Sequence, residues 1–107
     1  MSNEGHQLSV RDNEAEHRYE VDVDGQVAIL TYTRDDKHVI LLHTEVPPAL
    51  EGHGIAGMLA HAALEAARAC GREVVPLCPY VAAYIRRHRE YLPLVSEAQQ
   101  ARLLAQE

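Results

Sequence analysis

Residues 43–57 read HTEVPPALEGHGIAG and mark the point where the pattern of the chain changes from strand to helix. Apolar and polar residues alternate before this stretch, whereas an alanine-rich run with helical spacing follows it. Pro47 and Pro48 end the preceding strand, because proline lacks a backbone N–H and fixes φ. Three glycines then open the helix with almost no side-chain bulk. Such a start presents free backbone N–H groups at the positive end of a helix, which favours a phosphate or pyrophosphate ligand.

The length and composition predict one domain with one hydrophobic core. The chain has 107 residues, of which 47% are hydrophobic, and this is too short for two domains. Residues 1–16 are polar with few apolar anchors, so we expect a flexible N-terminal segment, with a short strand near residues 7–11, followed by a domain over residues 17–107. The chain has neither a run of roughly eighteen apolar residues nor a signal-peptide pattern. We therefore expect a cytoplasmic protein without a membrane partner.

Charge and cysteine usage exclude two classes of partner. The net charge of -6 argues against binding to a nucleic-acid backbone. Cys70 and Cys78 have no CxxC or zinc-like spacing, which indicates free thiols in a reducing compartment. The histidines include no i, i+4 pair, and strict alternation would place His38 and His43 on opposite faces of a strand. We therefore expect no metal.

The pattern predicts an α/β (α+β) fold with a mixed, mostly antiparallel sheet. Asp24-Gly25 is a two-residue hairpin turn, and Gly71 is a typical helix stop. The helix that follows the third strand would return the chain to a strand parallel to it. The expected elements are strands over 17–23, 27–33, 38–46 and 73–78, a central helix over 53–70, a second short helix over 80–88, an irregular segment over 90–95 and a last helix capped by Ser96.

The glycines admit three interpretations. Residues 52–57 match the dinucleotide pattern G-x-G-x-x-G, but that motif needs a large parallel sheet and an acidic residue about twenty positions later. Here the preceding strands are antiparallel and position 77 is a leucine. A second interpretation is a tight turn and nothing more. The third is close approach of a ligand, because the glycines exceed what a turn requires.

The order of these motifs resembles the GCN5-related N-acetyltransferase superfamily. Residues 51–56 lie on its core motif, Q/R-x-x-G-x-G/A. More narrowly, a family of very small, single-domain acetyltransferase-like proteins is similar in HTEVPP at 43–48, GHGIA at 52–56, VPLCPYV at 75–81 and IRRH at 85–88. The resemblance covers about residues 17–95.

The resemblance implies a binding site for acetyl-CoA. The pyrophosphate would lie on the backbone N–H groups of the glycine loop, and the pantetheine arm would follow the third strand, where it parts from the strand that ends at Cys78. The cofactor-binding residues would be Val46, Gly52, His53, Gly54, Ile55, Ala56, Gly57 and Arg87. Glu51 replaces the usual Arg or Gln, so we expect it to point to solvent and to weaken binding.

Acetyl transfer to an amine needs a base, a donor to the thioester carbonyl and an acid for the leaving thiolate. Cys78 precedes a helix and could carry the acetyl group or relay a proton, although buried cysteines commonly serve as small hydrophobes. His43 and Glu45 share one face of the third strand, and either is a candidate base or part of a solvated face. Tyr84 is a candidate acid or a packing residue, and it shares a helix face with Tyr80.

The sequence therefore predicts an acetyl-CoA-dependent N-acetyltransferase. Its short chain leaves no room for the additional elements that build the acceptor pocket in longer members of the superfamily. An open, shallow acceptor site suits a protein or peptide amine, or completion by a partner. The alternative from another class is a non-catalytic module that binds CoA or acyl-CoA as a sensor or interaction domain.

Overall fold

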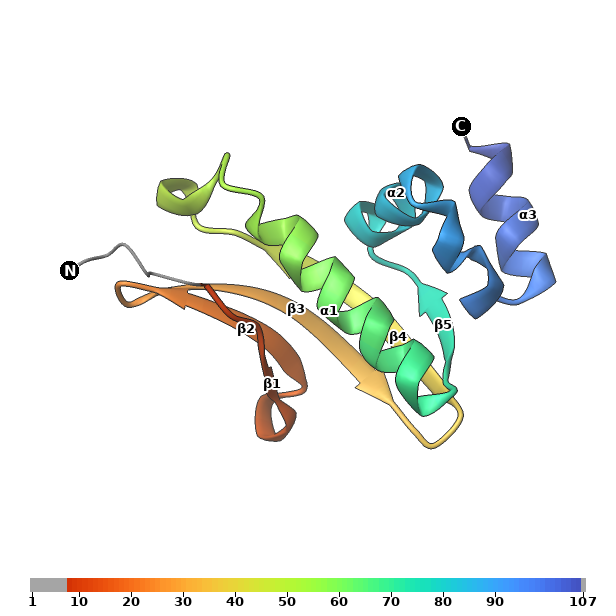
Figure 1. Cartoon of the computed structure of the whole chain (residues 1–107), viewed down its shortest axis with the longest axis horizontal. Helices are drawn as coiled ribbons and strands as arrows, with labels where there is room; N and C mark the ends of the chain where they lie inside the picture. Colours follow the sequence, from red (N-terminus) through yellow and green to blue (C-terminus); the bar gives the residue numbers. More distant parts are fainter. Residues whose placement is uncertain (1–7, 107) are drawn as a thin grey trace.

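A computed structural model describes residues 8–106 and contains one five-stranded sheet with its central helix laid across one face (Figure 1). In chain order the elements are β1 (Arg11–Asn13), the 3-10 helix η1 (Glu14–Glu16), β2 (Arg18–Val23), β3 (Gln26–Arg34), β4 (His38–Glu45), the 3-10 helix η2 (Pro48–Leu50), α1 (Ile55–Cys70), β5 (Glu73–Pro76), α2 (Pro79–Arg87), the 3-10 helix η3 (Arg89–Leu94) and α3 (Glu97–Ala105).

The strand order in the sheet is β1-β2-β3-β4-β5. The first four strands pair antiparallel, and β5 pairs parallel to β4 after the chain returns through α1. The predicted fold class, a mixed and mostly antiparallel sheet with a central helix after the glycine loop, is confirmed.

The core lies between α1 and the sheet face that it covers. Alternate strand residues such as Val21, Leu30 and Leu41 are fully buried, and Leu59 and Leu64 of α1 are buried against this layer. Small alanines on the same helix let it approach the strands closely. The residues between the buried strand positions lie on the other sheet face, and several of them are exposed.

A β-bulge in β4 changes the face of the residues after it. Thr33 pairs with Ile40 and Thr31 pairs with His43, so three residues of β3 lie opposite four of β4. Because Thr31 and Thr33 share a face, Ile40 and His43 share one as well. The prediction that His38 and His43 lie on opposite faces is therefore wrong, since alternation from one to the other assumed an unbroken strand.

The ladder between β4 and β5 is short. It covers His38–Leu41 and Glu73–Pro76, while β4 continues to Glu45. Beyond the ladder, the Cys78 amide donates to the Leu41 carbonyl at 2.8 Å, and the chain then enters α2. The segment that follows β5 therefore separates from β4 beside the last residues of β4.

Several element ends differ from the predicted ones. α1 begins at Ile55 rather than at residue 53, because Gly54 is in the left-handed region and precedes the helix. β5 ends at Pro76, two residues early, since proline offers no N–H to continue a ladder. The segment after α2 forms a 3-10 helix, where an irregular segment was expected. Ser96 caps α3 as predicted, accepting a hydrogen bond from the Gln99 amide.

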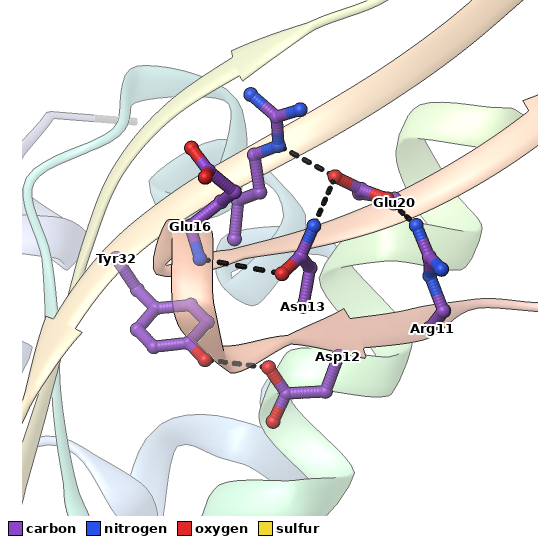
Figure 2. A network of polar contacts seen from close by, with 7 residues as sticks. Arg11, Asp12, Asn13, Glu16, Glu20 and Tyr32 are labelled. Atoms are coloured by element: carbon purple, nitrogen blue, oxygen red, sulfur yellow. Dashed lines mark hydrogen bonds and ion pairs between the residues drawn. The ribbon is translucent and has the colours of Figure 1, made fainter.

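The sheet begins before residue 17, where the sequence placed the start of the domain. β1 pairs with β2, and the buried carboxylate of Glu20 holds it in place (Figure 2). That carboxylate accepts hydrogen bonds from Arg11, from Asn13 at 2.9 Å and from Arg18 at 2.6 Å. The strand expected near residues 7–11 thus lies at Arg11–Asn13, and Gln7 lies outside the described residues.

Tyr91 attaches η3 to α1. Its buried hydroxyl donates to Glu65 Oε2 at 2.7 Å and lies 3.0 Å from His61 Nδ1. The Arg68 guanidinium lies over the ring, 5.0 Å from its centroid. Burial and the Glu65 carboxylate raise the pKa of Tyr91, so this contact keeps its proton at neutral pH.

None of the helices within residues 8–106 combines the length and apolar character needed to cross a bilayer.

Candidate functional site

A hollow of about 150 Å³ lies where the glycine loop, the end of β4 and the start of α2 meet. Six predicted cofactor-binding residues line it: Val46, Gly52, Gly54, Ile55, Ala56 and Gly57. The structure adds Leu50, Glu51 and Tyr80. We call this space the glycine-loop hollow.

The N-terminus of α1 opens toward this hollow without a side-chain cap. Gly52 and Gly54 have φ of 85° and 74°, a left-handed backbone that glycine adopts without strain. No side chain accepts from the first amides of α1, and its first turn carries no acidic residue. α3, by contrast, has both a serine cap and an acidic first turn, whereas α2 also starts without a side-chain cap but has a proline as its first residue. The bare start of α1 leaves its amides free for an anion.

Gly57 has a packing role in addition to its place in the lining. A Cβ at this position would lie 3.6 Å from the Tyr80 hydroxyl and 3.8 Å from Cε2 of Tyr84. A side chain longer than a methyl group would meet these tyrosines. A methyl group at position 57 would make ordinary van der Waals contact with these rings, whereas Gly52 and Gly54 have open space where a Cβ would be.

His53 faces a different space from the other loop residues. It lines a second hollow of about 520 Å³ on the side of the β2–β3 hairpin, which shares Leu50 and Ile55 with the glycine-loop hollow. The remaining lining residues of this second hollow are Leu8, Val23, Asp24, Gln26 and Ala49. The loop thus separates two spaces, and the sequence motif could not distinguish which side each residue faces.

Glu51 and Arg87 are both exposed, but only Glu51 lines the glycine-loop hollow. Glu51 is exposed, as expected, yet it also belongs to the lining of the glycine-loop hollow. Arg87 is exposed at the last residue of α2, seven residues after Tyr80. This spacing corresponds to roughly 10 Å along the helix axis. The hollow is therefore lined by a carboxylate, and the predicted phosphate-binding arginine is not among its lining residues.

Cys78 is buried in contact with β4, two residues before the lining residue Tyr80. Its side chain is 2% exposed, and Sγ lies 3.2 Å from the Thr44 hydroxyl. It is the residue directly before α2, whose first residue is a proline. Cys70, by contrast, is exposed at the end of α1.

His43 and Glu45 lie together on the sheet face that α1 does not cover. The His43 Nε2 is 3.4 Å from Glu45 Oε2, and both side chains are exposed. Thr44 stands between them in sequence and points to the other face, because it pairs with the buried Leu30 and contacts Cys78. The candidate bases and the candidate nucleophile therefore approach β4 from opposite faces.

Tyr84 is buried between two rings of its own segment. Its ring stacks on His88 with centroids 4.1 Å apart and lies 6.4 Å from the Tyr80 ring. Burial raises the pKa of Tyr84, with a further contribution from Tyr80, so the phenol stays protonated and can donate. Tyr80, rather than Tyr84, belongs to the lining of the hollow.

Sequence reasoning did not assign two residues here: Tyr80, which lines the hollow, and Thr44, which contacts Cys78. A signal for Tyr80 was present, because Pro79 fixes the start of α2 and so places Tyr80 in the first turn next to the strand end. Thr44 carried no signal, since its partner is 34 residues away in the chain.

Among residues 8–106, no group of three or more His, Cys, Asp and Glu side chains is arranged to hold a metal ion.

Comparison with known proteins identifies one family. The sequence profile of a family described as GCN5-related N-acetyl-transferase matches residues 18–94, which is well over half of the chain. A search of curated proteins finds no match.

Proposed function

Because this chain belongs to the GCN5-related N-acetyltransferase family, we propose that it transfers the acetyl group of acetyl-CoA to an amine. The observation that carries this proposal is the uncapped N-terminus of α1 at the glycine-loop hollow. Free amides at a helix start suit a pyrophosphate, and no carboxylate lies in the first turn of α1 itself.

The end of β4 suits the pantetheine arm. The β5 ladder stops at Leu41 while β4 continues to Glu45, so the edge of its last residues has no strand beside it within the described chain. An extended chain with amide groups can satisfy such an edge by hydrogen bonding. Val46 lies at the junction of this edge with the hollow. On this placement the thioester would lie deeper along β4, toward Thr44 and Cys78.

The acceptor amine would approach from the uncovered sheet face. There, His43 and Glu45 are exposed and in contact, and either can take the proton that the amine must lose. The amine nitrogen forms the new bond to the acetyl carbon, the carbon–sulfur bond breaks, and the departing thiolate takes up a proton. The phenols of Tyr80 and Tyr84 are the candidate donors for that proton.

Cys78 has two possible roles in this scheme. It can accept the acetyl group from acetyl-CoA and pass it to the amine, or it can relay a proton while the amine attacks directly. Its position before α2, in contact with β4, suits both roles.

A protein or peptide amine in the cytoplasm is the acceptor that the exposed sheet face suits best.

The experiment combines binding with transfer. Calorimetry measures binding of CoA, and mass spectrometry follows the acetyl group after incubation with labelled acetyl-CoA and a panel of amines and peptides. We expect acetylated acceptor. Tight binding without any transfer would favour a non-catalytic CoA-binding module, which the same hollow would also support, and absence of binding would contradict both proposals.

The role of Cys78 has its own test in a matched pair of variants. Cys78→Ala should lower the transfer rate by at least about a hundredfold if the thiol takes part, because a positioned proton-transfer group contributes roughly 10²–10⁴-fold and a nucleophile opens a separate covalent route. Cys70→Ala, which removes the exposed thiol at the far end of α1, should leave the rate unchanged. Equal rates in the two variants would exclude Cys78 from the mechanism.

A further inference from the structure

We propose that Thr44 is a positioning residue for Cys78: its hydroxyl fixes the sulfur beside the last residues of β4 and donates a hydrogen bond to it when it is charged. This inference rests on the proposed function, in which Cys78 takes part in transfer. It adds a residue that neither the motif nor the family match assigns.

The position of the contact relative to the hollow is the first argument. Val46 and Tyr80 both line the hollow. Two residues back along each chain are Thr44 and Cys78, whose Oγ1 and Sγ lie 3.2 Å apart. Thr44 lies on the sheet face that α1 covers, because it pairs with the buried Leu30. The pair therefore lies next to the point where β4 and the segment that follows β5 begin to separate.

The way in which the two chains are held is the second argument. The Cys78 amide donates to the Leu41 carbonyl at 2.8 Å, which anchors the backbone of Cys78 to β4. The side-chain contact to Thr44 adds a second attachment on the far side of the bulge. With both contacts in place, the sulfur has a fixed position relative to the strand along which we place the pantetheine arm.

The chemistry of the two groups is the third argument. A threonine hydroxyl donates one hydrogen bond and accepts others, and a thiol does the same weakly, so the neutral pair can bond in either sense. A thiolate only accepts, and then Thr44 must be the donor. Hydrogen bonds to charged groups are the stronger class, so the hydroxyl contributes most when the sulfur is charged.

The test measures the reactivity of the thiol without acetyl-CoA. In the full chain with Cys70→Ser, which leaves Cys78 as the one thiol, the rate of alkylation by iodoacetamide is compared for Thr44→Val, Thr44→Ser and Thr33→Val. Valine keeps the shape of threonine and removes the hydroxyl, serine keeps the hydroxyl, and Thr33 is an exposed threonine on β3.

We expect Thr44→Val to slow alkylation about tenfold, while Thr44→Ser and Thr33→Val stay within about twofold of the parent. A purely structural role would give the opposite sign, because loosening the contact exposes the buried sulfur and speeds its reaction. Faster alkylation in Thr44→Val, or no change, would overturn the proposal. This outcome is independent of whether the protein transfers acetyl groups.

A second measurement connects the contact to transfer. We expect Thr44→Val to lower kcat about tenfold with an unchanged KM for acetyl-CoA, and to have no effect when Cys78→Ala is already present, because the hydroxyl acts through the sulfur. Additive losses in the double variant would contradict the positioning role while leaving the proposed function intact.

Discussion

At the scale of single residues, two carboxylates in different parts of the molecule, Glu20 and Glu51, lie in very different surroundings. Glu20 is buried and surrounded by three donors that neutralise it. Glu51 is exposed, and it lies in the lining of the hollow that we assign to a pyrophosphate. A negative charge at that point opposes an anionic ligand, although solvent weakens the repulsion.

At this scale we predict that Glu51→Gln strengthens binding of CoA. Removing one exposed charge near the pyrophosphate should lower the dissociation constant about threefold to tenfold at low salt, and the gain should shrink as salt screens the repulsion. Calorimetry at two ionic strengths measures both effects. Asp36→Asn changes the net charge equally in an exposed turn away from the loop and is the control. An equal gain in that variant would assign the effect to net charge.

At the scale of elements, α1 combines a structural and a binding role in one terminus. Its body covers the sheet, while its N-terminus leaves amides without side-chain acceptors. The left-handed Gly54 is what directs the chain into the helix at this point. A residue with a Cβ would strain this backbone and would add bulk where the amides face the hollow.

We therefore predict two effects of Gly54→Ala, a loss of stability of about 1–2 kcal/mol from backbone strain and a loss of CoA affinity of tenfold or more. Gly25→Ala is the matched control, because Gly25 also has a positive φ, of 85°, but lies in the β2–β3 turn. It should lose similar stability and keep its affinity for CoA. Urea unfolding and calorimetry measure the two quantities, and parallel losses of affinity in both variants would contradict a direct role of the loop.

At the scale of the whole molecule, one ionised carboxylate joins the first strand to the rest of the sheet. The hydrogen bonds from Arg11, Arg18 and Asn13 lower the pKa of Glu20 from 4.5 to about 2. A carboxylate whose pKa is lower in the folded chain than in the unfolded chain stabilises the fold above the unfolded pKa. That contribution decreases as the pH falls from about 4.5 toward 2.

We predict that Glu20→Gln lowers the free energy of unfolding by about 2 kcal/mol at pH 7, and that the difference from the parent narrows by about half at pH 3. Urea titrations at several pH values measure it. Glu16→Gln is the control, because only the Glu16 backbone amide joins the network shown in Figure 2, through Asn13. A difference that does not change with pH would show that Glu20 acts through packing rather than through its charge.

The sequence by itself determined the main strands and helices, their order and the motif. The alternation of apolar and polar residues predicted the strands. Pro47 and Pro48 predicted the end of β4, and the glycines predicted where α1 begins. These signals are local properties of the backbone. The parallel direction of β5 followed from the helix between it and β4. Six of the residues that the resemblance implied for cofactor binding line one hollow, where the glycine loop, the start of α1 and the residue after β4 meet.

Only the tertiary structure decided which face each candidate residue occupies. The bulge in β4 reverses the alternation between His38 and His43, because one extra residue shifts every following side chain to the other face. The contact between Thr44 and Cys78 joins residues 34 positions apart, and it forms where β4 and the chain after β5 begin to diverge. A sequence pattern records neither feature, since both depend on the register between strands that are distant in the chain.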